Sequence, residues 1–459
     1  MRVPSRRYRT RYTKLRWSRS DDNVSAVSDA RPNRAPAPPG PRLAAKLREQ
    51  LVTDLRRADE LRGEAVAGAL GEVPREAFVS EIAAKQGVEA VYRNAPLPVK
   101  VDARGRWLSS SSQPSMMALM LEQLELTPGQ RVLEIGAGTG YNAALLRHLV
   151  GSAGRVTTVE IDSALARKAR SALRASGYAV KVVHGDGRVG FPADAPYDRI
   201  IVTASAKEIP NAWLAQLRSG GRLVLPLQLA LYPVPQVIPA LERRDGMLRS
   251  VAMTWGWFMP LHGGDGGQRG PPDNLCASVQ VGGEHSELMR ISGPGLTRRS
   301  DSGRRALLAL VLREPRMRTL RGHIANHWPA PPGLLLHLFS CLPAARRIEL
   351  RSPRRWAIGL VSETGAALVV ASMPARQSGR ADSPDMLRQP KPKPWWVESY
   401  GDPSLAGELE DEIDEILAGW HALTSSGRTQ LQIHARQSSA SSIAELTLGW
   451  TEPEMVVPS

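Results

Sequence analysis

The sequence predicts an α/β protein with a doubly wound, largely parallel sheet, followed by a C-terminal α+β extension. Three observations support this prediction. Short β-rich runs alternate with helix-like stretches between about residues 128 and 226, a glycine-rich segment follows the first run, and the chain contains no internal repeat. Strand–helix alternation at this spacing is typical of βαβ units, whose strands are parallel.

The individual elements follow from hydrophobic periodicity. Five strands are expected, at 131–135, 155–159, 180–183, 199–202 and 222–225. Helices are expected at 141–150, 163–176 and 211–218. Apolar residues at helical spacing between 43 and 70 predict two further helices, of which the second ends before Pro74. A last amphipathic helix is expected at 405–423, with its acidic side chains in solvent.

Composition divides the chain into four predicted parts. Residues 1–42 are basic and proline-rich, so they are expected to be disordered; a start codon upstream of the native one would also account for them. Residues 43–262 are predicted to form the catalytic domain and residues 263–274 a glycine-rich linker. Residues 275–459 are predicted to form a C-terminal domain that contributes to substrate recognition, and 375–393 a long loop within it.

Charge and cysteine usage exclude several classes of protein. The 459 residues carry a net charge of +15, but arginine is spread along the chain, which favours a solvated basic surface over a nucleic-acid partner. The two cysteines, Cys276 and Cys341, provide neither a disulfide framework nor metal-ligand spacing. No apolar run is long enough to span a membrane, and the polar, arginine-rich N-terminus is not a secretory signal. We therefore expect a cytoplasmic protein without a metal.

The glycine-rich segment Val132-Leu-Glu-Ile-Gly-Ala-Gly-Thr-Gly140 joins a predicted strand to a helix. Glycines suit a sharp turn where the backbone approaches a ligand, and the helix N-terminus that follows favours a carboxylate or phosphate. By itself the segment is also compatible with a dinucleotide. The candidate ligand-binding residues within it are Glu134, Gly136, Gly138 and Gly140.

Two acidic positions narrow the choice of ligand. Glu160 ends the second strand and can accept hydrogen bonds from both ribose hydroxyls, and Asp186 with Gly187 follows the third strand, where a carboxylate can take an adenine amino group. The third glycine of the loop also comes one position earlier than in Gly-x-Gly-x-x-Gly. Together these features resemble class I methyltransferases with a Rossmann-like sheet, and the resemblance implies S-adenosyl-L-methionine as the cofactor.

The segments upstream resemble one family of such enzymes. The fourth strand is followed by Val202-Thr-Ala-Ser-Ala206 instead of an Asn-Pro-Pro-Tyr motif, which disfavours methylation of an exocyclic base nitrogen. The upstream segments are Val73-Pro-Arg-Glu-Ala-Phe-Val79, Tyr92-Arg-Asn-Ala-Pro-Leu-Pro98 and Ser109-Ser-Ser-Ser-Gln-Pro-Ser115. Over residues 45–262 their order is similar to that of protein-L-isoaspartate O-methyltransferases. The resemblance implies carboxyl O-methylation of a protein or peptide that bears aspartate or isoaspartate.

Site residues follow from the same resemblance. It implies that Ser112 contacts the substrate carboxylate and that Ser110 stands where the family usually has threonine, so both are candidate catalytic residues. Ser109, Ser111 and Gln113 are candidate substrate-binding residues. The family's usual Gly-Gln is Leu108-Ser109 here, which leaves open whether the target is isoaspartate.

The expected chemistry needs no dedicated base. A carboxylate with a pKa near ~4 is already ionised at neutral pH and is itself the nucleophile. Catalysis then depends on holding its oxygen in line with the methyl group, and serine hydroxyls can orient a carboxylate without a permanent ion pair. The methoxy group of the methyl ester leaves more readily than hydroxide, so the following backbone nitrogen can close a succinimide with loss of methanol.

Three functions remain open at this stage. One is repair of isoaspartyl residues in aged proteins. The second is methylation of an ordinary aspartate in a ribosomal peptide precursor, which the altered serine segment and the extension of about 190 residues favour slightly. The third is an RNA-directed methyltransferase or a non-catalytic nucleic-acid-binding module, for which salt-sensitive RNA binding would be the evidence.

Overall fold

The architecture comes from a computed structural model of the chain. It describes residues 41–103, 107–229, 236–261, 276–281, 287–296, 299–311, 316–319, 334, 337–338, 341–343, 346–351, 355–362, 365–372, 396–425 and 430–451. The predicted linker 263–274 and the predicted loop 375–393 lie wholly outside the described residues. The predicted N-terminal segment 1–42 lies outside them except for residues 41 and 42.

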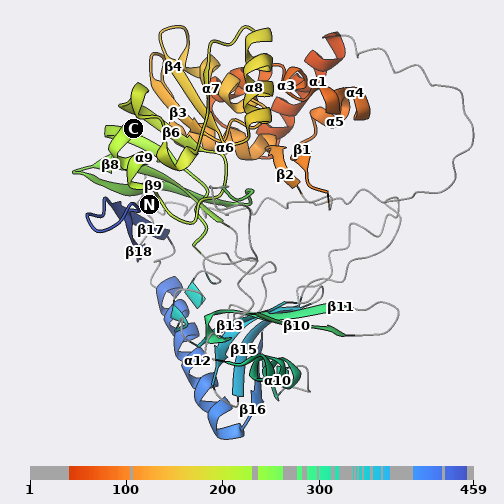
Figure 1. Ribbon diagram of the computed structural model, residues 1–459, viewed down its shortest axis with the longest axis vertical. Helices are drawn as coiled ribbons and strands as arrows, with labels where there is room; N and C mark the ends of the chain where they lie inside the picture. The colour runs from red at the N-terminus through yellow and green to blue at the C-terminus, as the bar shows by residue number, and fades with distance from the viewer. Residues whose placement is uncertain are drawn as a thin grey trace, which may run out of the picture. The chain divides into compact units, whose positions relative to one another are not determined.

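The larger sheet in the described part of the protein has nine strands, in the order β18-β17-β9-β8-β7-β6-β3-β4-β5. Figure 1 labels most of them. The sheet's five parallel strands are β3 (Arg131–Ile135), β4 (Arg155–Glu160), β5 (Lys181–His184), β6 (Tyr197–Val202) and β7 (Leu217–Val224). Four antiparallel strands extend it, namely β8 (Gln236–Arg244), β9 (Met247–Gly256), β17 (Gln430–Arg436) and β18 (Glu445–Thr451). The doubly wound, Rossmann-like prediction is confirmed.

Alternate residues of the parallel strands face different cores. Val132 and Ile201 pack into a cluster formed with the helices that precede the sheet, while Leu133 and Ile200 lie on the opposite face with Trp213. This alternation is what a parallel sheet with both faces covered requires. Because both faces are covered, polar groups that bind a ligand are expected on the loops that follow the carboxyl ends of the strands.

In the part of the chain that the structure describes, nine helices precede or connect these strands. They are α1 (Pro41–Arg57), α2 (Glu64–Glu72), α3 (Arg75–Phe78), α4 (Ser80–Gln86), α5 (Val88–Val91), α6 (Pro114–Leu124), α7 (Tyr141–Val150), α8 (Ser163–Ala175) and α9 (Asn211–Gln216), with 3-10 turns η1 (Gly187–Val189) and η2 (Pro192–Asp194). The helices predicted before residue 220 are confirmed to within a few residues. Asp162 begins α8 by accepting hydrogen bonds from the backbone N–H groups of Ala164 and Leu165.

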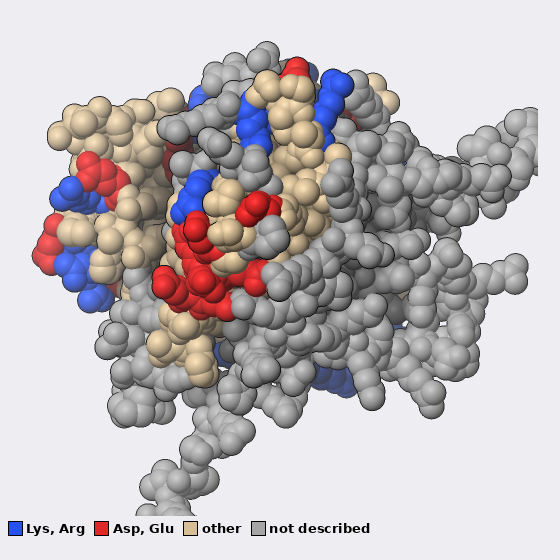
Figure 2. All heavy atoms as spheres, turned by 90° about the horizontal axis from the view of Figure 1, so that it is seen from below, with Lys and Arg blue, Asp and Glu red and all other residues tan. Residues whose placement is uncertain are grey.

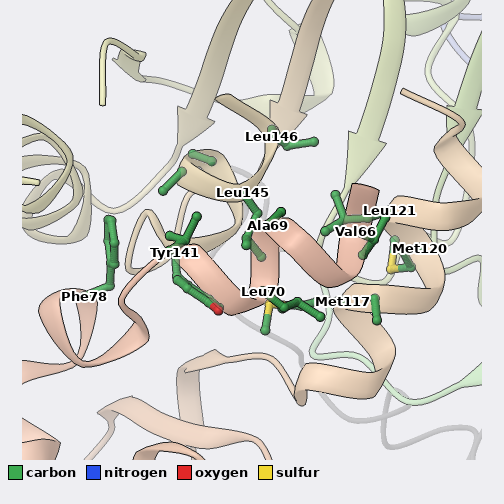
Figure 3. Packing of buried hydrophobic residues seen from close by; sticks show 14 of the residues in the cluster. Val66, Ala69, Leu70, Phe78, Met117, Met120, Leu121, Tyr141, Leu145 and Leu146 are labelled. Carbon is green, nitrogen blue, oxygen red and sulfur yellow. The ribbon is translucent and has the colours of Figure 1, made fainter. Parts of the chain in front are cut away.

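The helical core is apolar and continuous. Figure 3 shows residues of α2, α6 and α7 packed together, with Tyr141 beside Phe78 and Leu70. The Phe78 and Tyr141 ring centroids lie 5.8 Å apart. This cluster fixes α7, which begins directly after the glycine-rich loop, against the N-terminal helices.

The serine segment forms part of a hairpin. Strands β1 (Leu97–Val101) and β2 (Trp107–Ser111) pair antiparallel, with Leu97 opposite Ser111 and Pro98 opposite Ser110. Three of the four consecutive serines therefore have extended backbone, and the fourth lies just before α6.

A second sheet follows, which confirms the α+β character of the extension. Its seven strands are antiparallel, in the order β10 (Cys276–Val281), β11 (Glu287–Ser292), β13 (Arg347–Arg351), β14 (Arg355–Val361), β15 (Gly365–Ser372), β16 (Trp396–Gly401) and β12 (Arg316–Thr319). The 3-10 turn η4 (Pro294–Leu296) and the helices α10 (Asp301–Val311) and α12 (Pro403–Ser425) accompany it.

Helix α12 has the predicted amphipathic pattern. Leu409, Ile413 and Leu417 are buried, whereas Glu408 and Asp411 are exposed. Figure 2 shows acidic side chains gathered on one face of the protein. The prediction of a buried apolar stripe with a solvated acidic face is confirmed for this helix.

The last two strands return to the first sheet. β17 pairs with β9 through His434 opposite Arg249, and the N–H of Ala444 donates to the carbonyl of Ile209 at 2.8 Å. Residues 430–451 thus belong to the nine-stranded sheet, although the predicted boundary assigned them to a domain at 275–459. The domain boundaries stay a prediction, to which this pairing adds a detail that periodicity could not supply.

Candidate functional site

The glycine-rich loop joins β3 to α7 with three glycines in the left-handed region. Gly136, Gly138 and Gly140 have φ values of 97°, 52° and 87°. A Cβ on Gly136 would lie 2.6 Å from Oγ1 of Thr203, and a Cβ on Gly140 would lie 3.2 Å from Leu173. Glycine is therefore required by backbone conformation at all three positions and by close packing at the first.

Glu134 lies beneath this loop and is fully buried. Its carboxylate accepts hydrogen bonds from Asn142 Nδ2 at 2.8 Å and from Thr158 Oγ1 at 2.6 Å. Burial raises the pKa of Glu134 to about 7 in spite of these two bonds. The Glu134 side chain thus links β3 to α7 and β4, and these hydrogen bonds stabilise the elements on either side of the loop. Its direct contact with a cofactor stays a prediction.

Glu160 connects the end of β4 to the same loop. Its Oε2 accepts from the Gly138 N–H at 2.8 Å and its Oε1 from the Asp162 N–H at 3.0 Å. Each carboxylate oxygen has two lone pairs, so both oxygens keep acceptor capacity for ribose hydroxyls. The hydrogen bond between the Gly138 N–H and Glu160 therefore fixes the loop and this carboxylate relative to each other.

Asp186 and Gly187 follow β5 at the same edge of the sheet. The Asp186 carboxylate accepts from Arg188 Nη2 at 2.7 Å and from the Arg188 N–H at 2.9 Å. This guanidinium holds the pKa of Asp186 below its usual range. A Cβ on Gly187 would lie 2.4 Å from Cγ2 of Ile135, so glycine lets this turn approach β3 closely.

The serine strand lies against the glycine-rich loop. A Cβ on Gly138 would lie 3.9 Å from both Oγ of Ser109 and the carbonyl oxygen of Ser110. On the other side, the Ser110 hydroxyl lies 3.5 Å from Sδ of Met259. Lys100 of β1 forms an ion pair with Asp162, the residue that caps α8 after Glu160. The hairpin and the loop thus lie together near the carboxyl ends of β3 and β4, where they form one candidate site.

Sequence comparison supports a single family for this arrangement. The model of the protein-L-isoaspartate(D-aspartate) O-methyltransferase family matches residues 46–266. A protein-L-isoaspartate O-methyltransferase from Methanopyrus kandleri is 40% identical over 225 residues, which are 49% of this chain and 94% of that protein. One from Pyrobaculum neutrophilum is 39% identical over 214 residues, 46% of this chain and 97% of that protein. The chain belongs to the protein-L-isoaspartate O-methyltransferase family.

Among solved structures, one titled protein-L-isoaspartate O-methyltransferase has a TM-score of 0.46 and 24% identity, covering 87% of this chain and 99% of that one. A Plasmodium falciparum structure, titled a putative member of the family in complex with S-adenosyl-L-homocysteine, has a TM-score of 0.39 and 20% identity. It covers 47% of this chain and 98% of its own.

In this chain, the residues predicted to contact the substrate differ in how deeply they are buried and in their hydrogen-bond partners. Ser109, Ser110 and Ser112 are half-buried, whereas Ser111 is buried and its Oγ accepts from Arg75 Nη2 at 3.3 Å. Gln113 is also buried and donates to Oγ of Ser115 at 2.9 Å. The last two side chains are therefore engaged inside the protein, and their direct contact with substrate stays a prediction.

Sequence reasoning missed three residues that shape the site. Arg75 contacts the serine strand, Lys100 ties the hairpin to Asp162, and the Thr203 hydroxyl donates to the Gly136 carbonyl at 2.6 Å. Arg75 lies within a segment on which the resemblance rests, and Thr203 lies in the segment that follows the fourth strand, so their places in the sequence were the available signal. Their partners come from other parts of the chain, which periodicity does not reveal.

The residues present fit an adenosyl cofactor. Three left-handed glycines shape the loop, and a Cβ at Gly136 or Gly187 would collide with Thr203 or Ile135 and displace the turns at this edge of the sheet. Glu160 and Asp186 follow neighbouring strands at the same edge, where their carboxylates can accept from hydroxyl and amino groups. No group of three or more His, Cys, Asp or Glu side chains that could hold a metal occurs in the part of the chain that the structure describes. Nor is any helix there long and apolar enough to cross a membrane.

Proposed function

We propose that the protein is an S-adenosylmethionine-dependent carboxyl O-methyltransferase that forms a methyl ester on an aspartyl or isoaspartyl carboxylate of a protein or peptide. The observation that carries this proposal is the proximity of the serine strand to the Gly138 turn, where an added Cβ would lie 3.9 Å from Ser109 and Ser110, in a chain of this family. This proximity places the serines that are candidates for binding the substrate carboxylate next to the loop proposed to bind the methyl donor. The cytoplasmic location remains a prediction.

The residues divide the work between the two ligands. Gly136, Gly138, Glu160 and Asp186 would hold the cofactor, which supplies an electrophilic methyl group on a sulfonium. Within the described chain the Ser112 hydroxyl has no hydrogen-bond partner, so it can donate to the substrate carboxylate. The carboxylate oxygen forms the new bond to the methyl carbon, and the electron pair of the methyl–sulfur bond goes to sulfur.

No proton transfer is needed for this step, because the nucleophile is ionised at neutral pH. The protein contributes by orienting the oxygen and by excluding water. After release of the ester, the next backbone nitrogen can attack the ester carbonyl. Loss of methanol then gives a succinimide.

Two peptides that differ only in aspartate or isoaspartate would test the proposal. We expect the purified chain with S-adenosylmethionine to add one methyl group, followed by mass, to at least one of them. Turnover of isoaspartate alone supports repair. A lack of turnover on both, with the cofactor bound, would contradict action on simple peptides and leave a dedicated precursor, with residues 275–459 as the proposed recognition domain.

The role of Ser112 has its own test. Ser112→Ala removes one hydrogen bond to a charged group, so kcat/KM should fall about 10- to 100-fold. Ser171→Ala, at an exposed position of α8, is the matched control and should behave as wild type. Equal activity of the two variants would remove Ser112 from the site.

A further inference from the structure

Arg75 is fully buried at the start of α3, and its guanidinium donates hydrogen bonds to two other segments of the chain. Its Nη2 donates to the Ser112 carbonyl at 2.9 Å and to Oγ of Ser111 at 3.3 Å. Its Nη1 donates to the Val91 carbonyl at the end of α5, also at 2.9 Å. One side chain thus holds the backbone on both sides of the Ser111–Ser112 bond.

The same guanidinium also meets the cofactor side of the site. Its Cζ lies 5.9 Å from the centroid of the Tyr141 ring, within the range of a cation–π contact. Tyr141 is the first residue of α7, directly after Gly140. Arg75 therefore contacts the serine strand and the helix that begins at the glycine-rich loop.

A contribution to folding stability does not by itself explain why an arginine is buried at position 75. No carboxylate pairs with Arg75 among the described residues, and its Nε is buried without a hydrogen-bond partner there. Burial lowers the pKa of Arg75 to about 10, which reflects the cost of removing the cation from water. A buried charge without a counter-ion is weak evidence for a stabilising role.

We propose that Arg75 is a positioning residue that fixes the backbone of Ser111 and Ser112 relative to the glycine-rich loop, so that the Ser112 hydroxyl is presented to the substrate carboxylate. The inference rests on the proposed function in taking Ser112 as the substrate contact. Arginine suits this position because its planar fork places two nitrogens on separate acceptors, which one lysine nitrogen cannot reach together.

The expected consequence is a loss of orientation while the cofactor still binds. Arg75→Lys keeps the charge but not the fork, so kcat/KM for the peptide should fall about 10- to 100-fold, as expected for a small misplacement of a reacting group. The Kd of S-adenosylhomocysteine should change less than about threefold. Ser111→Ala, which removes only one acceptor, should lower kcat/KM about fivefold.

Arg199→Lys is the matched control. Arg199 also donates to backbone carbonyls, those of Leu124 at 2.7 Å and Glu125 at 3.1 Å, but it does not contact the serine strand. Loss of kcat/KM in Arg75→Lys but not in Arg199→Lys, at similar thermal stability, supports the proposal. Wild-type kcat/KM in Arg75→Lys, or a parallel loss of turnover and cofactor affinity, would overturn it.

Hydrogen exchange separates this inference from the proposed function, because it needs no turnover. Amides of residues 107–113 should exchange faster in Arg75→Lys than in wild type and should be unchanged in Arg199→Lys. Unchanged exchange in Arg75→Lys would refute the positioning role even if the wild type methylates neither peptide. Inactivity of the wild type would count against the proposed function alone.

Discussion

The nine-stranded and the seven-stranded sheet both bury acidic side chains, but the surroundings of these side chains differ. In the nine-stranded sheet, Glu134 and Glu160 lie at or near the carboxyl ends of neighbouring parallel strands. In the seven-stranded sheet, Glu349 and Glu398 lie within antiparallel strands, and Glu398 accepts a hydrogen bond from Tyr400 on its own strand. Both pairs are buried, yet among the described residues only the first pair adjoins a glycine-rich loop.

The difference follows from strand direction. Parallel strands bring all their carboxyl ends to one edge, so loops from several strands meet there and can form a site. In an antiparallel sheet the carboxyl ends of neighbouring strands lie at opposite edges, so the loops that follow these strands do not meet at one edge. We therefore expect substitutions at the first sheet's strand ends to affect ligand binding, and substitutions in the second sheet to affect folding.

The largest expected effect is the pH response of Glu134. Its pKa is about 7 in the folded protein, against an ordinary value of 4.5, so the folded state keeps a proton that the unfolded state loses between these values. Stability should fall by about 3 kcal/mol as pH rises from 4.5 to 7. Glu134→Gln should remove this dependence, because the Asn142 amide can turn to keep its hydrogen bond.

Hydrogen exchange of β3 amides at pH 5 and pH 8, corrected for intrinsic rates, would measure the effect locally. Glu242→Gln is a suitable control, because Arg244 lowers the pKa of that acid instead of raising it. Equal pH dependence in wild type and Glu134→Gln would show that Glu134 stays ionised when buried.

Gly136→Ala should reduce cofactor affinity about 100-fold, because a left-handed φ is strained for alanine and the new Cβ meets the Thr203 hydroxyl. Calorimetric titration with S-adenosylhomocysteine would measure it. Gly68→Ala, with open space around the added Cβ in α2, is the matched control. An unchanged Kd in Gly136→Ala would mean that the loop does not hold the cofactor.

Gly359→Ala addresses the second sheet. Its Cβ would lie 1.9 Å from the Ala367 carbonyl, so we expect a loss of about 2 kcal/mol in the stability of β14 and β15. Exchange of their amides should quicken, while the Kd of S-adenosylhomocysteine stays unchanged. A weakened Kd would instead indicate that the second sheet contributes to the site.

The first sheet was predictable because each βαβ unit leaves local signals: apolar strands, a glycine-rich turn and an acid at a strand end. The return of β17 to β9 was not, because pairing across about 180 residues leaves no pattern in either strand. In the site, glycine spacing located the loop, and family motifs located the serines. The burial of Ser111 against Arg75 depends on tertiary packing, which no local signal encodes.

The smallest expected effect concerns Asp186, whose carboxylate binds Arg188 in the described structure. If Asp186 receives an adenine amino group, the guanidinium competes for its oxygens, so Arg188→Gln should tighten S-adenosylhomocysteine binding about threefold; a half-exposed ion pair is worth little. Arg436→Gln breaks an exposed ion pair with Glu445, between strands β17 and β18, and should leave the Kd unchanged. A weaker Kd in Arg188→Gln would mean that Arg188 orients Asp186 for the ligand, and the ion pair would then belong to the binding site.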